Sequence, residues 1–360
     1  MGQITRADAL TDVAGLRVGH ARVPGDRALS GTTVVLAPEG GAVAAVDVRG
    51  GGPGTRDTDA LDPRNLVQRV DAVVLTGGSG YGLDAVSGVM AWLEEQGRGF
   101  RVGPDPAQVV PVVPAACLFD LGRGGDWRAR PDAATGRAAV EDAARTEAGA
   151  PVAEGGVGAG TGAVVGALKG GVGSASVVLD SGITVGALAV VNAVGSAVDP
   201  LTGVLYGRYF GGRVDYPAAE VHEAAQRRLD EARKETERRS AGFARPPLNT
   251  TLAVVATDAE LTRAQAQKLA GTAHDGLARA VRPVHLLTDG DTVFALSTGT
   301  RPLLTETPEP VFAAHVGATA LNEVLAAGAD ALTRAVVKAV LAAEGFDGPG
   351  GAYPAYRDLY

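Results

Sequence analysis

The sequence lacks several features that would place it in a familiar class. It has a single cysteine, Cys117, among 360 residues, which excludes an internal disulfide framework and any metal site built from several thiolates. Lysine is scarce, since only Lys169, Lys234, Lys268 and Lys338 occur. The 33 Lys and Arg residues are outnumbered by 41 Asp and Glu residues. With a net charge of −8 and no basic patch, nucleic acid is not an expected partner.

Long apolar runs are missing as well. The longest uncharged apolar stretch, residues 183–198, is shorter than the roughly 18 residues of a membrane span and contains Gly, Asn and Ser. Residues 1–15 contain no apolar core of a signal peptide. Together with the lone cysteine, these features predict a soluble cytoplasmic protein with no membrane partner.

What is present is a globular composition with many glycines. Hydrophobic residues make up 46% of the chain, charged residues 21%, and there are 51 glycines, which mark turns and close backbone approaches. Short β-branched runs predict strands at 32–36, 43–48, 72–75, 112–119, 172–179, 184–191, 251–257, 284–287 and 291–298. Helical patterns lie at 83–95, 136–147 and 262–280, and two helices are expected within 310–343. Because the strands are rich enough in Val to be buried on both faces, we predict a layered α/β sandwich.

Residues 216–245 differ in character from the rest of the chain. Their Arg- and Glu-rich pattern is typical of an exposed helix, and the sequence SAGFARPPLN follows it. We therefore interpret 212–249 as a linker.

Cofactor and metal patterns are weak. Residues 158–163 fit G-x-G-x-x-G/A, and Asp180 follows at the distance of a ribose contact, but no strand precedes the motif and no helix follows it. The five His residues show no metal-ligand spacing, and Cys117 lies in the apolar context of an inert core thiol. We expect neither a cofactor nor a metal.

Two polar clusters could carry chemistry, and each also has a structural interpretation. Asp289 and Asp291 would project from one face of an extended strand, where they could hold one cation, orient one nucleophile or simply end a hairpin. The run from Asn249 through Thr250 to Thr251 lies where the charged segment meets a buried strand. It is either a nucleophile or a strand start after a Pro-Pro turn. No G-x-S-x-G elbow occurs.

An ordered set of segments covers nearly the whole chain and is similar to the DmpA or S58 peptidase family of N-terminal-nucleophile hydrolases. This family includes β-aminopeptidases, a pantetheine hydrolase and the nylon-oligomer hydrolases. The segments are TDVAGLRVGH (11–20), GTTVVLAP (31–38), DVRGGGPGTRDTDAL (47–61), LTGGSGYGLDA (75–85), VPAACLFDLGRGGD (113–126), VGAGTGA (157–163), LKGGVGSAS (168–176), VVNAVG (190–195), NTTLAVVATDA (249–259), AHDGLARAVRPVH (273–285) and DGDTVFAL (289–296).

The resemblance implies an αββα sandwich that cuts itself between Asn249 and Thr250. One domain, 1–360, would thus become the fragments 1–249 and 250–360, assembled as a homotetramer of such pairs. Thr250 would be the nucleophile of an amide hydrolase. Its freed α-amino group, with an ordinary pKa of about 7.7–8.0, would be the base, so that no catalytic His is needed.

The resemblance also assigns roles to other residues. Asn192 would donate to the oxyanion, with Tyr81 as a helper, and Lys169 would lie near the Thr250 hydroxyl. Each also has a structural interpretation: Asn192 as the cap of a turn, Tyr81 as a core residue and Lys169 as the solvent-exposed end of a strand. Asp289 and Asp291 would orient the Thr250 amine and hydroxyl.

The pattern around the nucleophile bears on the substrate. Positions 289 and 291 resemble Ser and Glu in the aminopeptidase branch. The Asp-Gly-Asp here, with Thr as nucleophile, looks like the nylon-oligomer and pantetheine hydrolase branch instead, which favours a linear aliphatic amide such as a 6-aminohexanoate oligomer. The alternatives are a β- or D-aminopeptidase, an acyltransferase like ornithine acetyltransferase, and a non-catalytic binding protein of the same fold.

Overall fold

The β-branched runs form two large sheets in the computed structural model, which describes residues 6–212, 214–240, 248–304, 309 and 311–360. The first sheet has the order β1-β2-β5-β8-β4, and the second has the order β11-β12-β13-β14-β3. The strands of the first sheet are β1 (Arg17–Arg22), β2 (Gly31–Leu36), β4 (Gly54–Arg56), β5 (Ala72–Thr76) and β8 (Ala115–Cys117). Those of the second are β3 (Val43–Val48), β11 (Gly171–Val178), β12 (Thr184–Val191), β13 (Leu252–Ala259) and β14 (Thr292–Arg301). The pairs β5–β8 and β13–β14 are parallel, and the other neighbours are antiparallel.

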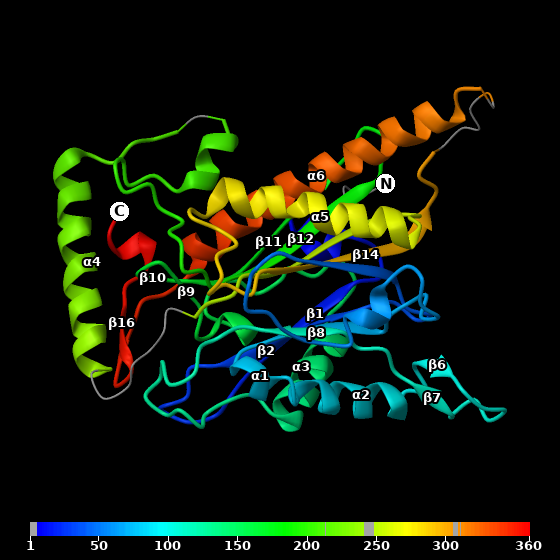
Figure 1. Cartoon of the computed structure of the whole chain (residues 1–360), viewed down its shortest axis with the longest axis horizontal. Helices are drawn as coiled ribbons and strands as arrows, with labels where there is room; N and C mark the ends of the chain where they lie inside the picture. Colours follow the sequence, from blue (N-terminus) through cyan, green and yellow to red (C-terminus); the bar gives the residue numbers. More distant parts are fainter. Residues whose placement is uncertain (1–5, 213, 241–247, 305–308, 310) are drawn as a thin grey trace.

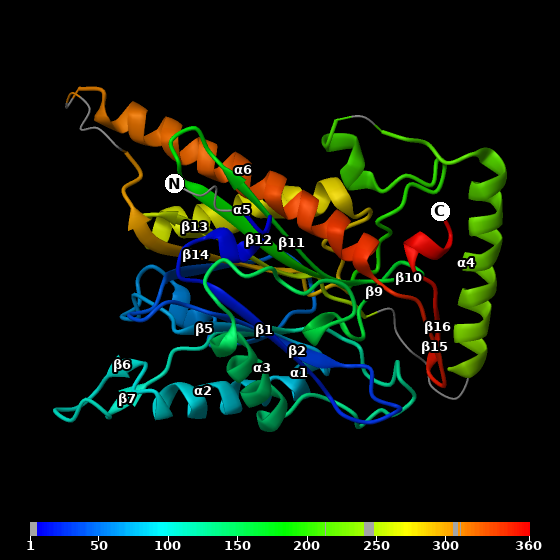
Figure 2. The same ribbon diagram turned by 180° about the vertical axis from the view of Figure 1, so that it is seen from behind.

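Helices cover the outer faces of both sheets (Figure 1). The helices α2 (Ala85–Glu95) and α3 (Ala133–Arg145) pack on the first sheet, and α5 (Arg263–Ala280) and α6 (Ala313–Ala342) pack on the second. Figure 2 shows the same four layers from behind. The expected αββα sandwich is thereby confirmed.

An apolar layer lies between the two sheets. Its fully buried side chains come from both of them: Val35, Val73, Leu75, Leu188, Val254 and Phe294. Because the same strands also face helices, they are apolar on both faces, which is why their sequences are runs of Val, Ala and Leu rather than alternating patterns.

Shorter elements complete the fold. They are α1 (Ser79–Gly82), α4 (Ala219–Arg239), the hairpins β6 (Phe100–Arg101) with β7 (Val109–Val110), β9 (Val164–Val165) with β10 (Leu168–Lys169) and β15 (Phe346–Gly348) with β16 (Gly351–Tyr353), and the 3-10 turns η1 (Leu10–Asp12), η2 (Asp59–Leu61), η3 (Gly158–Gly160), η4 (Tyr206–Phe210) and η5 (Tyr356–Asp358). The helix α4 lies at one end of the sandwich beside β16 (Figure 1). In the residues that the structure describes, no helix combines the length and the apolar character needed to cross a membrane.

Most of the expected elements are present. The helix expected at 262–280 is α5, and the Thr262 side chain caps it by accepting from the N–H of Gln265. The exposed helix expected within 216–245 is α4, so most of the interpreted linker 212–249 is helical, while residues 213 and 241–247 lie outside the described residues.

Three expectations were wrong. Residues 284–287 are a loop rather than a strand, because His285 has a positive φ of 60° and the backbone N–H groups of His285 and Leu286 donate to carboxylates instead of a neighbouring strand. The strand expected at 112–119 shrinks to β8, since Pro111 and Pro114 have no N–H for a ladder. The two helices expected within 310–343 are the single helix α6; residue 310 lies outside the described residues.

The contact between α2 and α3 depends on glycine. A Cβ at Gly136 would lie 1.8 Å from the carbonyl oxygen of Ala85, and a Cβ at Gly88 would lie 1.8 Å from that of Ala133.

We predict that Gly136→Ala lowers the free energy of unfolding by about 1–3 kcal/mol, although alanine has the better helix propensity. Denaturant unfolding would measure this. The control is Gly317→Ala in α6, where the added Cβ meets open space. This variant should leave the free energy of unfolding unchanged or raise it by up to about 1 kcal/mol. Equal effects in the two variants would contradict the close packing.

Candidate active site

The bond between Asn249 and Thr250 lies at the start of β13, between two neighbouring strands. The N–H of Thr250 donates to the carbonyl oxygen of Asn192 (2.7 Å), the residue directly after β12. The N–H of Asn249 donates to the carbonyl of Thr288 (3.2 Å), and the carbonyl of Asn249 accepts from the N–H of Gly290 (3.2 Å). Thr250 is only 4% exposed. Thr250 is therefore compatible with both interpretations of this segment, the start of a strand and a candidate nucleophile.

The Thr250 hydroxyl lies against the carbonyl group of the preceding residue. Its Oγ1 donates to the carbonyl oxygen of Asn249 at 2.5 Å, and the Gly290 N–H donates to the same oxygen. A Cβ at Gly290 would lie 2.6 Å from Thr250 Oγ1, so only glycine permits this approach. The Gly290 N–H would stabilise the negative charge that develops on the Asn249 carbonyl oxygen if the Thr250 hydroxyl attacked the Asn249 carbonyl carbon.

Asn192 is fully buried, and hydrogen bonds at both ends of its amide fix the amide's orientation. Its Oδ1 accepts from Arg123 Nη1 (2.5 Å) and from the N–H of Val164 (3.0 Å), and its Nδ2 donates to the carbonyl of Phe119 (3.4 Å). Asn192 contacts Thr250 through its backbone carbonyl rather than its amide. The resemblance implied a role for the Asn192 side chain, whereas the observed contact with Thr250 is made by the Asn192 backbone carbonyl.

Arg123, which was not expected from the sequence, binds both Asn192 and Asn249. Its Nη2 donates to Asn249 Oδ1 (2.5 Å), while Nη1 donates to Asn192 Oδ1 and to the carbonyl of Gly162 (2.7 Å). The side chain is 8% exposed and follows β8 in the chain. Its only signal in the sequence is an arginine flanked by glycines just after a buried strand.

Lys169 is buried. Its Nζ donates to the carbonyls of Gly160 (2.9 Å), Ala163 (3.0 Å) and Gly170 (2.9 Å). Three carbonyl acceptors match the three N–H groups of an ammonium. Burial, and after it the positive charge of Arg123, lower the pKa of Lys169 to about 7. Lys169 is thus surrounded by backbone carbonyls, and Arg123 is one of the charged groups close enough to affect its pKa.

Asp120 is a second ionisable group that was not expected from the sequence. Its Oδ1 accepts from the N–H of Gly78 (2.7 Å), and its carboxyl interacts electrostatically with Arg123 and Lys169. Burial raises the pKa of Asp120 to about 6. Asp120, Arg123 and Lys169 therefore form a buried charge cluster of one acid and two bases next to Asn192.

Asp289 is fully buried directly before Gly290. Its Oδ1 accepts from the N–H of Val194 (3.1 Å), and its Oδ2 accepts from that of Leu286 (3.3 Å). Burial, and then the charge of Asp291, raise the pKa of Asp289. The carboxylate thus joins the segment after β12 to the loop before β14.

Asp291 is also fully buried and contacts the residue after the candidate nucleophile. Its Oδ1 accepts from the N–H of Thr251 (2.8 Å), and its Oδ2 accepts from the backbone N–H (3.1 Å) and Nδ1 (2.8 Å) of His285. The His285 ring packs edge-on against His274, 4.8 Å between centroids. In the described residues, no group of three His, Cys, Asp or Glu side chains is arranged to hold a metal ion.

Tyr81 is placed differently from the other expected residues. It lies on α1, is 57% exposed, and its ring stacks under the guanidinium of Arg130 at 3.8 Å. The structure therefore brings Asn249, Thr250, Asn192, Asp289 and Asp291 into one connected network of hydrogen bonds. Lys169 is linked to this network through its electrostatic interaction with Arg123. No contact that joins Tyr81 to this network occurs in the described part of the chain.

A pocket of about 290 Å³ opens beside Asn249. Its apolar lining includes Phe119, Leu121, Val164, Val194 and Tyr353. Its charged lining is Arg123 from the site, together with Arg233 and Glu237 from α4.

The raised pKa of Asp120 predicts a pH dependence. Since the folded pKa of about 6 lies above the ordinary 3.8, the carboxyl contributes stability that is complete below pH 3.8 and is lost as the pH rises through 6. Asp120→Asn lacks this loss. Relative to the wild type, its free energy of unfolding should rise by about 2 kcal/mol between pH 4 and 7. Denaturant unfolding at several pH values would measure it, and parallel curves would contradict a buried titrating Asp120.

Comparison with known sequences identifies relatives along nearly the whole chain. The model of peptidase family S58 matches residues 8–353. An uncharacterized aminopeptidase of Mycobacterium tuberculosis is 47% identical over 98% of both chains. A 6-aminohexanoate-oligomer endohydrolase of Kocuria sp. is 30% identical over 87% of this chain and 81% of the relative.

Solved structures of aminopeptidases are also similar to this chain. A β-aminopeptidase of Burkholderia sp. superimposes with a TM-score of 0.68 at 26% identity, covering 100% of this chain and 94% of that one. An L-aminopeptidase D-Ala-esterase/amidase of Ochrobactrum anthropi, described as a variant of the Ntn hydrolase fold, gives a TM-score of 0.69 at 22% identity with the same coverage and shows the fold alone. The expectation of a peptidase or amide hydrolase is confirmed, and the chain belongs to peptidase family S58.

Proposed function

We propose that this protein is an N-terminal-threonine amide hydrolase that activates itself by cutting the bond before Thr250. One observation carries the proposal. The Thr250 hydroxyl is hydrogen-bonded at 2.5 Å to the carbonyl oxygen of Asn249, and the Gly290 N–H binds the same oxygen. A nucleophile, the carbonyl it would attack and a donor for the resulting oxyanion are thus together in the uncut chain.

The maturation step would run as an acyl shift. Thr250 Oγ1 attacks the Asn249 carbonyl carbon, the hydroxyl proton passes to the amide nitrogen of Thr250, and the C–N bond breaks to leave an ester. Water then hydrolyses the ester to the Asn249 carboxylate and the free hydroxyl. The Gly290 N–H supports the oxyanion, and the loss of one such donor costs about 2.7–4 kcal/mol of barrier lowering in other enzymes. The products are the fragments 1–249 and 250–360 of one catalytic domain.

Turnover would use the amine that maturation frees. With an ordinary pKa of about 7.7–8.0, it accepts the Thr250 hydroxyl proton near neutral pH. Oγ1 then attacks the substrate amide carbon, the substrate's amine leaves with a proton, and water hydrolyses the acyl-Thr250. The carbonyl of Asn192, which already accepts from Thr250 N at 2.7 Å, would hold that amine in place.

The remaining residues would support charge and position. In this proposal the Asn192 amide donates to the substrate oxyanion, and the cations Lys169 and Arg123 favour the alkoxide-like state of Thr250. Asp289 and Asp291 orient the nucleophile through the segments they bind on either side of it. Substrates would be small molecules or peptides. The homotetramer and the cytoplasmic location stay predictions.

Intact mass under denaturing conditions tests the self-cleavage. We expect two fragments from the wild type, separated between Asn249 and Thr250, and one uncut chain from Thr250→Ala, because the variant has no hydroxyl. The control, Thr250→Ser, keeps a hydroxyl and should also be cut. An uncut wild type, or cutting in Thr250→Ala, would contradict the proposal.

A further inference from the structure

One arginine connects the residues on the two sides of the bond before Thr250. Arg123 Nη2 donates to Asn249 Oδ1 at 2.5 Å, and Arg123 Nη1 donates to Asn192 Oδ1 at 2.5 Å. The backbone carbonyl of Asn192 accepts in turn from the N–H of Thr250 at 2.7 Å. Asn249 and Thr250 are therefore joined a second time, through Arg123 and Asn192, as well as by their own peptide bond.

The chemistry of the guanidinium group fixes how the two side-chain amides are oriented. An arginine side chain has five N–H donors in one rigid plane and no acceptor, so each amide must turn its oxygen toward it. At Asn192 the N–H of Val164, a second donor, requires the same orientation (3.0 Å). The Oδ1 atoms of Asn192 and Asn249 are therefore held at fixed places on one rigid group.

Arg123 contacts Asn249 from a different direction than the backbone does. The Asn249 N–H donates to the carbonyl of Thr288, and the Asn249 carbonyl accepts from the N–H of Gly290, so both backbone bonds lead toward β14. The contact with Arg123 comes instead from the loop after β8, a strand of the first sheet. Contacts from two directions restrict rotation of the Asn249 carbonyl group, and attack on a carbonyl carbon depends on its orientation.

Arg123 is itself closely packed. Its side chain is 8% exposed, and Nη1 also donates to the carbonyl of Gly162 at 2.7 Å. A Cβ at Gly350 would lie 2.2 Å from the carbonyl oxygen of Arg123, so the turn between β15 and β16 packs directly on the backbone of this residue. The arginine therefore depends on the position of the hairpin that β15 and β16 form.

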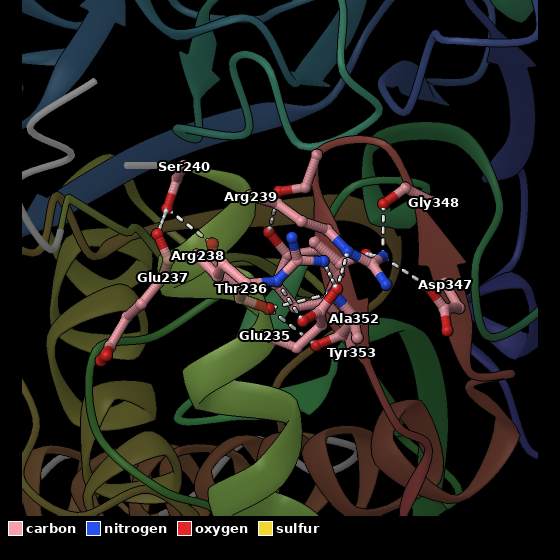
Figure 3. Close-up of polar contacts among 12 residues, drawn as sticks. Glu235, Thr236, Glu237, Arg238, Arg239, Ser240, Asp347, Gly348, Ala352 and Tyr353 are labelled. Atoms are coloured by element: carbon pink, nitrogen blue, oxygen red, sulfur yellow. Dashed lines mark hydrogen bonds and ion pairs between the residues drawn. The ribbon is translucent and has the colours of Figure 1, made fainter. Parts of the chain in front are cut away.

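Helix α4 holds that hairpin. Thr236 Oγ1 donates to the carbonyl of Ala352 and accepts from its N–H, both at 3.0 Å. Arg239 Nη1 donates to Asp347 Oδ1 (2.5 Å) and to the carbonyl of Gly348 (2.6 Å). Figure 3 shows these bonds between the helix and the hairpin. Arg123 is thus enclosed by elements that are bound to one another, as a residue that must hold another in place requires.

From this geometry we propose that Arg123 is a positioning residue for the self-cleavage, and that it makes an acceptor oxygen on the side chain of residue 249 a requirement of the cut. This inference rests on the proposed function. Arg123 holds the Asn249 carbonyl group in reach of the Thr250 hydroxyl without touching the reacting atoms. An Asn or Asp at position 249 presents an oxygen to the guanidinium, whereas a Leu of similar shape presents none.

The test measures how fast newly made full-length chains cut themselves, by cell-free translation and a timed chase with intact mass as the readout. Asn249→Leu and Arg123→Met each remove the contact while keeping an apolar side chain of related shape. Each should slow the cut roughly tenfold to a hundredfold, the range for a hydrogen bond to a charged group. Asn249→Asp keeps an oxygen for Arg123 and should be cut at close to the wild-type rate.

The double variant shows whether the two slow rates have one cause. If Arg123 acts through the side chain of Asn249, the second substitution adds little once the first has removed the contact. We therefore expect Arg123→Met combined with Asn249→Leu to be cut about as slowly as Arg123→Met alone. Separate structural damage at the two positions would instead multiply the two effects. The comparison of Asn249→Leu with Asn249→Asp tests the contact without altering the arginine.

The matched control is Arg130→Met, which removes the same charge from the same loop. The Arg130 guanidinium stacks on Tyr81, apart from the network around Thr250, so this variant should be cut at the wild-type rate. A wild type that cuts itself no faster than Asn249→Leu, or a double variant in which the two effects multiply, would overturn this inference alone. A wild type that stays uncut would overturn the proposed function and this inference with it.

Discussion

The hydrogen bond from the Thr250 N–H to the Asn192 carbonyl organises the site, and the pairing of the second sheet makes it possible. In the register of that sheet Leu252 pairs with Val190 of β12 and with Thr292 of β14. Because β13 and β14 are parallel, both begin at the edge where antiparallel β12 ends. A buried threonine at the start of β13 therefore lies between Asn192 and the Asp-Gly-Asp turn without any special loop.

A second constraint is the cost of burying charge. Arg123, Lys169 and Asp120 are all removed from water, and each is surrounded by oxygens, N–H groups or opposite charge. The glycine-rich segment 158–163, whose spacing fits a dinucleotide motif, is part of this arrangement. Two of its carbonyls bind the ammonium of Lys169. Its glycines bring the backbone close to side chains, and no phosphate is needed to explain them.

The sequence predicts the layers well and the site only in part. The Val-rich strands and the helix at 262–280 can be recognised from the sequence, because β-branched runs and helical periodicity are local patterns. The loop at 284–287 cannot, since a non-local carboxylate, that of Asp291, takes the N–H of His285. Thr250 and its neighbours were expected as site residues only through the family resemblance, and their roles stay predictions. Arg123 and Asp120 were not, because an ionisable residue in a loop shows its burial only once distant segments enclose it. Tyr81, by contrast, was recognised but lies apart from the site.

The order of strands in the second sheet has a consequence for how the mature protein would fail. Strands β13 and β14 lie between β12 and β3 in the second sheet. If the bond before Thr250 is cut as proposed, that one continuous sheet would consist of two chains, with β13 and β14 on the second. Unfolding would then release two diffusing molecules, and refolding would become a second-order encounter between chains that never folded separately. The working lifetime of such a protein is governed by its unfolding rate rather than by an equilibrium between folded and unfolded states.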